Sequence, residues 1–359
     1  MSSNLGLLDS ALHKPTTAVT REEIILALWY GNATNKPSIN ESSWSAYFAY
    51  YLRECEAALA NPEEISIKTH RDLLEAAHHL QHDSTEDDIK RKLQRSITHQ
   101  CSSTGEKRIM DGSIRLAVRI LTMVNIGLLH TEVSGQLIVQ WHHGSLQEAI
   151  HEHFNSQAEI DTEFEHAIFG SEITCRNIEH MTNIQVVPTD NLADHMRLVE
   201  SGKKLCMFRH IAFLNMLKDS KLPLFPKGFA EETLDTLRLL LPENDRKTRV
   251  WLEDEFKMRA GYSCFDRGLL KCGYFKLGHP SRSLKHYKFW RDRLEVLKDT
   301  VEEATPPSKA LLKALRDRKA GDRWLNSWVA MFAIGLTLFF GLVQSIEGAI
   351  QVYKAYHSS

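Results

Sequence analysis

The pattern of hydrophobic and polar positions changes abruptly near the C-terminus of the chain. Residues 324–346 form a run of 23 positions without a charged side chain, whereas charged residues recur at short intervals before it. A helix of about 20 apolar residues spans the roughly 30 Å hydrocarbon core of a bilayer. The pattern therefore predicts one transmembrane helix at 324–346, followed by a short tail at 347–359. The alternative is a hydrophobic helix that packs against the domain or against a partner.

The residues that flank this run predict its orientation. Residues 305–323 form a basic segment whose cations are Lys309, Lys313, Arg316, Arg318, Lys319 and Arg323. Because Lys and Arg accumulate on the cytosolic side of membrane helices, we expect the residues before the span to lie in the cytosol. Residues 1–9 lack the features of a signal peptide, so we expect the C-terminal segment to direct insertion. The endoplasmic reticulum is the favoured membrane, and the outer mitochondrial and vacuolar membranes remain alternatives.

The sequence before the span is patterned mainly for helices. Apolar residues recur at spacings of three and four, and Ser, Thr and Pro mark helix starts. The pattern predicts an all-α or α-dominated cytosolic domain with one small β element. Its parts are a flexible lead (1–19), an N-terminal helical region (20–154) and a C-terminal helical region (155–304). The last two regions form either one domain or two.

The same pattern predicts where individual elements lie. Residues 136–141 are expected to form a short strand or hairpin arm, and residues 184–188 a brief strand. Residues 98–108 are expected to form a loop. The expected helices that matter below are 113–129, 192–200, 204–218 and 282–303.

Composition and charge narrow the class of protein. The chain has 359 residues, of which 43% are hydrophobic and 25% charged, and its formal net charge is −2. This composition is typical of a globular domain, and the lack of a basic excess argues against a nucleic-acid partner. No pair among the six cysteines has CxxC spacing, so reduced thiols are expected. We predict no cofactor.

A Cys–His pair is the first candidate for chemistry. The sequence lacks the HExxH, GxSxG, GxxxxGK[S/T] and GxGxxG motifs. Cys206 and His210 lie four residues apart on the expected helix 204–218, and such a couple can generate a nucleophilic thiolate. The surrounding residues are apolar, so a buried thiol beside a core histidine is the favoured interpretation.

Histidine clusters provide a second kind of candidate. His78 and His82 lie four residues apart on one helical face, a spacing that suits a metal ion if further ligands exist. His142, His143, His151 and His153 bracket a short helix and would titrate near neutral pH if they lay together. A solvated polar surface is the favoured interpretation of both clusters, and we predict no metal site.

Small side chains recur along the apolar run. They are Ala333, Thr337, Gly341, Ser345 and Ala349, each four residues after the last. Such a stripe lets helix backbones approach closely, and Thr or Ser can hydrogen-bond across the contact. It predicts that the helix associates with a second copy or with another membrane helix. The alternative is a monomeric anchor in which these small residues have no partner.

The C-terminal segment resembles one shared by a large group of filamentous-fungal proteins of unknown function. The resemblance rests on residues 339–349 and 351–355, with Trp324 and Trp328 ahead of them. Looser similarity covers 204–210, through Lys204, Leu205, Cys206, Phe208 and His210, and 288–294, through Lys288, Phe289, Trp290, Arg293 and Leu294. The resemblance implies a fungal origin and a single C-terminal membrane segment. It implies no activity, cofactor or catalytic residue.

Three functions are compatible with these observations. The favoured one is a membrane-anchored interaction or scaffold protein whose domain binds an unknown protein partner. The second is an enzyme or accessory factor of a biosynthetic pathway that is held at the membrane to meet lipophilic substrates. The third is a membrane-perturbing defence protein whose helices oligomerise in the bilayer.

Overall fold

The computed structural model contains an α-dominated domain and one long apolar helix, as the sequence predicted. It describes residues 6–31, 39–81, 85–94, 103–127, 135–156, 168–170, 173–220, 222–259, 266–271, 281–304 and 321–357. Within these residues there are twelve α-helices and two small sheets. The chain divides into two compact units, 1–299 and 300–359.

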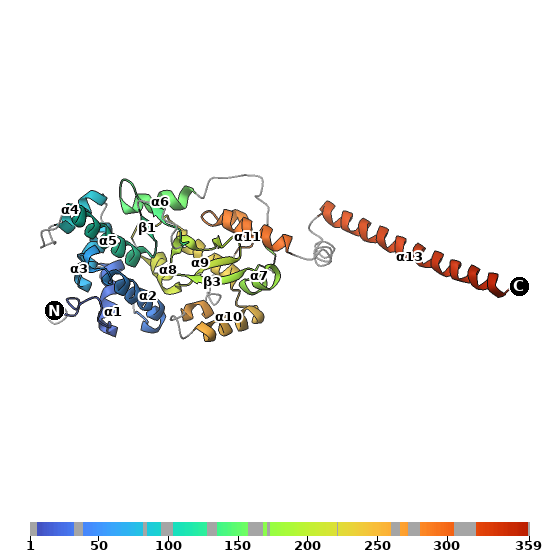
Figure 1. Cartoon of the computed structure of the whole chain (residues 1–359), viewed down its shortest axis with the longest axis horizontal. Helices are drawn as coiled ribbons and strands as arrows, with labels where there is room; N and C mark the ends of the chain where they lie inside the picture. The colour runs from blue at the N-terminus through green and yellow to red at the C-terminus, as the bar shows by residue number, and fades with distance from the viewer. Residues whose placement is uncertain are drawn as a thin grey trace. The chain divides into compact units, whose positions relative to one another are not determined.

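The helices account for most of the described residues (Figure 1). They are α1 (Ala18–Ile25), α2 (Glu41–Leu59), α3 (His70–Gln81), α4 (Glu86–Gln94), α5 (Ser103–Thr122), α6 (Leu146–Ser156), α7 (Cys175–Thr182), α8 (Ile211–Asp219), α9 (Phe229–Leu240), α10 (Arg246–Arg259), α11 (Arg291–Glu303) and α13 (Gly321–His357). Shorter helical turns are η1 (Leu26–Tyr30), η2 (Pro62–Glu64), η5 (Leu192–Asp194), η6 (Arg267–Lys271) and η7 (Leu284–His286).

Aromatic side chains cap the C-terminal end of the central helix α5. Its last carbonyls have no partner within the helix. Trp29 Nε1 donates to the carbonyl of Leu121 over 3.2 Å, and the hydroxyls of Tyr47 and Tyr50 donate to the carbonyls of Ile120 (2.8 Å) and Arg119 (3.1 Å). These bonds attach η1 and α2 to α5, while ring contacts of Trp29, Tyr47 and Phe213 fill the space between them.

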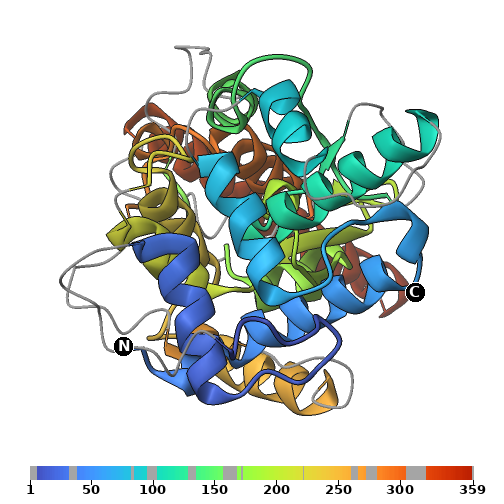
Figure 2. The same ribbon diagram turned by 90° about the vertical axis from the view of Figure 1, so that its left-hand side faces the viewer.

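Two small sheets lie among the helices (Figure 2). The larger one contains β3 (Gln185–Thr189), β5 (Lys204–Phe208) and β4 (Leu198–Val199) in the order β3-β5-β4, with β3 parallel and β4 antiparallel to β5. The smaller one pairs β1 (Ile126–Gly127) in parallel with β2 (Val139–Gln140). One face of the larger sheet packs on α7, where the thiol of Cys175 lies 3.4 Å from the sulfur of Met207.

The outer edge of β3 is closed to further strands. The amide of Val186 donates to the Glu179 carboxylate of α7 over 2.8 Å, and Pro188 has no N–H to offer. A charged cover and a proline are common means of blocking an edge strand.

Several expected elements were wrong. Residues 204–218 are not one helix, because 204–208 form β5 and α8 begins at Ile211. The expected helix 192–200 is η5 followed by β4, which forms a hairpin with β5 through Glu200, Ser201 and Gly202 at φ 52°, 55° and 81°. The expected helix 282–303 contains only η7 and α11, helix 113–129 ends at Thr122, and α5 starts inside the expected loop 98–108.

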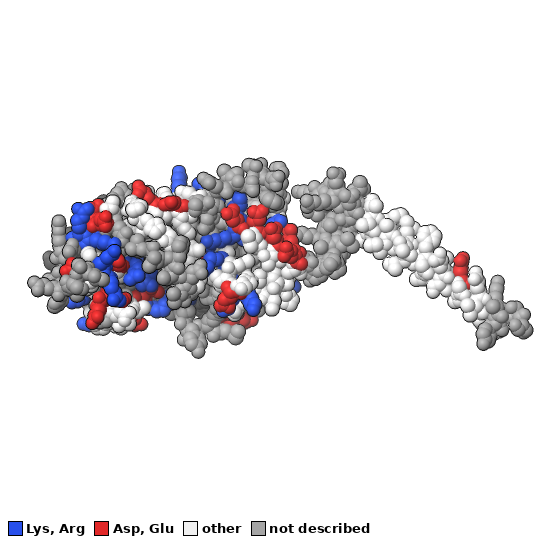
Figure 3. Space-filling model, turned by 45° about the horizontal axis from the view of Figure 1, so that its top comes forward, with Lys and Arg blue, Asp and Glu red and all other residues white. Residues whose placement is uncertain are grey.

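The second unit contains α13, whose apolar surface is uncovered. Its segment Trp328–Tyr353 is the one helix among the described residues that is long and apolar enough to cross a membrane, and none of its apolar window is buried. Phe332 and Leu338 are 70% and 69% exposed. Figure 3 shows the described part of this helix as an uncharged surface interrupted by acidic atoms. The basic residues Lys309, Lys313, Arg316, Arg318 and Lys319 lie outside the described residues, and Arg323 lies in the first turn of α13.

Candidate functional site

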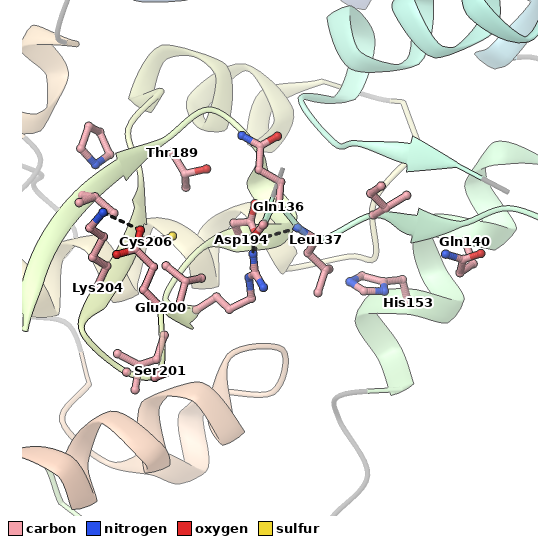
Figure 4. Close-up of a pocket in the computed structure, with 18 of the residues that line it drawn as sticks. Gln136, Leu137, Gln140, His153, Thr189, Asp194, Glu200, Ser201, Lys204 and Cys206 are labelled. Carbon is pink, nitrogen blue, oxygen red and sulfur yellow. Dashed lines mark hydrogen bonds and ion pairs between the residues drawn. The ribbon is translucent and has the colours of Figure 1, made fainter. Parts of the chain in front are cut away.

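A groove of about 1110 Å³ lies over the open face of the larger sheet (Figure 4). In the parallel register Val187 is opposite Cys206, so these side chains share one face with Lys204 and Thr189. The opposite wall contains β2 and α6. It is formed by Leu137, Ile138, Gln140, Ala149, Glu152 and His153. The floor of the groove therefore combines the apolar side chains of Val187 and Cys206 with the polar side chains of Lys204 and Thr189.

Asp194 joins the two walls at the base of the groove. Its carboxylate accepts hydrogen bonds from the Leu137 amide (3.0 Å) and from Asn191 Nδ2 (2.8 Å). It also pairs with Arg197 Nε at 2.6 Å. Arg197 in turn donates to the carbonyl of Gly135. The Asp194 carboxylate is only 2% exposed and accepts hydrogen bonds from at least three donors. It therefore holds the segment before β2 against the start of β4.

A β-bulge directs Arg197 toward Asp194. Met196 and Arg197 both face Cys206, since the Met196 amide donates to the Cys206 carbonyl (2.7 Å) and the Cys206 amide donates to the Arg197 carbonyl (2.9 Å). Met196 has a φ of 57°, a left-handed conformation that is costly for a residue with a large side chain. Such strain persists only where the surroundings enforce it, and it is common beside functional sites.

His195 lies behind the groove as a neutral structural residue. The hydroxyl of Thr236 donates to the Thr233 carbonyl (2.6 Å), so it must accept from His195 Nε2 (2.7 Å). The Phe208 amide donates to His195 Nδ1 over 3.2 Å, which is consistent with the same tautomer. Burial, helped by the charge of Arg293, lowers the pKa of His195 to about 3. The ring therefore stays uncharged at neutral pH.

A second buried polar cluster surrounds Asp190, just after β3. Its carboxylate accepts from Arg209 Nε (2.7 Å) and His210 Nε2 (2.7 Å), and Arg53 of α2 approaches to 2.6 Å. Burial raises the pKa of Asp190, but the bonds and charges of His210 and Arg209 outweigh it and hold the pKa well below its usual value. The cluster thus attaches α2 to the end of the sheet.

His210 belongs to this cluster and precedes α8. Asp266 accepts from the amides of Ile211 (2.6 Å) and Ala212 (3.2 Å), which caps the helix that follows His210. Burial lowers the pKa of His210, although Asp190 opposes the shift. Its Nδ1 is buried and has no hydrogen-bond partner in the described part of the chain.

The structure does not bring Cys206 and His210 together as a catalytic couple. Cys206 lies on β5 and lines the groove, whereas His210 lies beyond the end of that strand in the Asp190 cluster. Burial raises the pKa of the Cys206 thiol to about 11, so the thiol is protonated at neutral pH. The expected helical i, i+4 pairing was wrong because the residues are on extended chain.

The structure brings three of the four histidines around α6 to the same groove, whereas the His78–His82 pair lies partly outside the described residues. His78 lies on α3 with its ring 6.0 Å from that of His79, and His82 falls outside the described residues. His142, His143 and His153 line the groove, while His151 contacts the Pro223 carbonyl (3.0 Å). Burial and Arg293 lower the pKa of His153 to about 4. Within the described ranges no three His, Cys, Asp or Glu side chains are arranged to hold a metal ion.

The residues that organise this site were not among the candidates from the sequence. Asp194, His195 and Arg197 lie in the stretch 192–200 that was expected to form a helix, and Asp190 lies just before it. The available signal was the density of polar residues from Thr189 to His195 in an otherwise apolar region. Such groups must be buried with partners or lie on the surface.

Comparison with protein-family models finds no match, and comparisons with curated proteins and with solved structures find none either. In the groove, Cys206 is a protonated thiol, Asp194 accepts from at least three donors, and His195 lies buried behind the wall.

Proposed function

We propose that the chain is a membrane-anchored interaction protein. α13 would insert in a bilayer, and the groove over β3-β5-β4 would receive a segment of a partner protein. The observation that carries the proposal is the uncovered apolar surface of Trp328–Tyr353. A surface of this length, without charged residues before Glu347, is costly to leave in water and is stable in hydrocarbon.

The basic segment before the helix favours one orientation. Lys and Arg residues next to a span tend to remain cytosolic, which would place the domain in the cytosol and the short tail across the membrane. The endoplasmic reticulum is the favoured membrane. The side chains of this segment would also be attracted to anionic lipid headgroups.

A truncation tests the anchor directly. The full chain and a chain ending at Asp322 would each carry an N-terminal fluorescent protein and be fractionated with alkaline carbonate. We expect the full chain in the carbonate-resistant pellet and the truncated chain in the supernatant. Leu338→Arg with Leu342→Arg is the matched control that keeps the length but removes the apolar character. A full chain that is extracted by carbonate contradicts the anchor.

The glycosylation sequence at Asn40 tests the orientation. Asn40 is exposed and caps α2, and it begins the acceptor sequence Asn40-Glu41-Ser42. A cytosolic domain should leave Asn40 unmodified, whereas a luminal domain would expose it to glycosylation. A mass shift that is removed by an endoglycosidase and by Asn40→Gln would reverse the proposed orientation.

Site-specific crosslinking tests the groove. A photoreactive residue at His143, on the rim of the groove, should capture a discrete protein partner in membranes. The same residue at Lys247, exposed on α10, is the control. Crosslinks of equal strength at both positions, or none at His143, would count against the groove.

The small residues of α13 favour a second contact within the membrane. Ala333, Thr337, Gly341, Ser345 and Ala349 would let a second copy or another membrane helix approach closely. A Cβ built on Gly341 meets no atom within 4 Å, so nothing in the described chain occupies this side. Energy transfer between labelled full-length chains should fall with Gly341→Leu and persist with Leu342→Ala. An unchanged signal with Gly341→Leu would contradict self-association.

A further inference from the structure

A second cavity of about 720 Å³ lies between the end of α2, η2, α5 and the β1–β2 pair, and it shares Gln136 and Ile138 with the groove over the larger sheet. Its apolar wall contains Ala57, Ile114, Ile126 and Trp141. Its polar wall contains two arginines one turn apart on α5, Arg115 and Arg119. This is the volume of a small-molecule site, with one apolar side and one cationic side.

The two acidic residues of the cavity are neutralised from outside it. Asp111 pairs with Lys90 at 2.9 Å, and Glu64 pairs with Arg108 at 2.5 Å. Neither Lys90 nor Arg108 lines the cavity. Carboxylates that already have cations compete little for the arginines inside.

The arginines retain unused donors. Arg119 pairs through NH1 with Glu54 at 2.9 Å, but its Nε is buried and has no hydrogen-bond partner in the described residues. Arg115 is exposed and makes no ion pair with another described residue. In the larger groove, by contrast, Arg197 and Lys204 are paired with Asp194 and Glu200. The smaller cavity is therefore the one with positive charge in excess.

We propose that this cavity binds a small organic carboxylate with a flat apolar body. The planar guanidinium of Arg115 matches a carboxylate with two parallel N–H donors, and Arg119 adds positive charge on the same wall. The apolar body would lie against Ile114, Ile126 and Trp141. Gly112 lets η2 approach α5, because a Cβ there would lie 2.0 Å from the Glu64 carbonyl oxygen.

A matched pair of probes tests the charge requirement. Naphthalene-1-carboxylate and naphthalene-1-carboxamide have the same ring but differ in charge. Each would be titrated calorimetrically into the full chain in phosphatidylcholine nanodiscs, with empty discs subtracted. We expect the carboxylate to bind at least about tenfold more tightly than the carboxamide, because one charge-assisted hydrogen bond contributes about that much affinity.

Two variants on α5 locate the effect. Arg115→Gln should abolish the preference for the carboxylate, whereas Lys107→Gln, an equal change of charge at an exposed site outside the cavity, should preserve it. Unaltered circular dichroism will show that both variants are folded. Equal affinity for the two probes, no binding of the carboxylate, or equal losses in the two variants would each overturn the proposal.

Discussion

Nε2 of His195 lies 2.7 Å from the hydroxyl oxygen of Thr236, and both groups are buried. The hydroxyl proton is already directed to the Thr233 carbonyl, so the imidazole N–H depends on Thr236 for its acceptor. Arg293 donates to the carbonyl of the same histidine at 2.5 Å. This arrangement fixes the loop that carries Asp194 at the base of the groove.

Thr236→Val should destabilise the domain by about 1–3 kcal/mol, because it leaves the His195 N–H buried without an acceptor. Urea unfolding of the full chain in detergent measures the loss. Thr236→Ser is the control, since it keeps the hydroxyl and removes only a methyl group. If the serine variant is as unstable as the valine variant, packing and not the hydrogen bond explains the loss.

The depressed pKa of His195 predicts acid sensitivity. Between the ordinary pKa of about 6.5 and the folded value of about 3, the unfolded state binds a proton that the folded state does not. The free energy of unfolding should therefore decrease as pH falls through this range, by up to about 1.4 kcal/mol per pH unit. The contribution is complete above pH 6.5. His153, whose pKa is lowered to about 4, adds to the decrease in the free energy of unfolding as pH falls toward 4.

His195→Gln measures this contribution, because glutamine supplies an amide donor that does not titrate. The variant should be less stable than the native chain at pH 7, yet its stability should change less between pH 7 and pH 5. Unfolding curves at both pH values provide the comparison. Parallel pH dependence in the two proteins would show that other groups account for the slope.

Asp190→Asn should be among the most disruptive single substitutions in the domain. It removes the carboxylate shared by Arg53, Arg209 and His210, and Arg209 is 4% exposed by its side chain. Loss of one partner from a buried charge network costs roughly 3–5 kcal/mol. The partial exposure of Asp190 favours the lower end of this range.

Glu253→Gln is the matched control for the Asp190 network. Glu253 pairs with Arg249 at 3.2 Å, and the two side chains are 40% and 62% exposed. Surface pairs contribute at most about 1 kcal/mol. Thermal unfolding of both variants should therefore show a much larger decrease for Asp190→Asn, and similar decreases would contradict the burial argument.

The stability of the domain should depend on which residues form the β4–β5 turn at the groove rim. Ser201 and Gly202 both have left-handed conformations, and an Asn-Gly pair favours such turns. Ser201→Asn should stabilise the domain by roughly 0.5 kcal/mol, a fraction of the left-handed penalty. Gly202→Ala should destabilise it by roughly 1–2 kcal/mol. Opposite shifts in the melting temperature are expected, and shifts of the same sign would contradict the turn assignment.

The α-dominated fold and the long apolar helix could be predicted because both depend on local periodicity. Strand β5 could not be distinguished from a helix, since Leu205, Cys206, Met207 and Phe208 are all buried and do not alternate with polar residues. The run then continues into the apolar residues of α8. The Ser201–Gly202 pair, which is typical of a hairpin turn, was the feature of the sequence that favoured a strand at 204–208.

The groove required contacts that no local pattern contains. Asp194 meets the amide of Leu137, 57 positions earlier, and His195 meets Thr236, 41 positions later. The partly buried Asp190 and the buried His210 resemble helix caps or surface groups in the sequence. Their role follows only from partners that tertiary folding brings to them.

The blocked edge of β3 also limits strand pairing between copies of the chain that lie close together. Proteins confined to a membrane meet one another at high local concentration, and exposed strands are the usual templates for intermolecular pairing. Glu179 and Pro188 block strand pairing along β3, at one edge of the sheet. The strand at the opposite edge, β4, is only two residues long. If α13 anchors the chain in a bilayer, neighbouring copies would therefore gather without their sheets merging into a fibril.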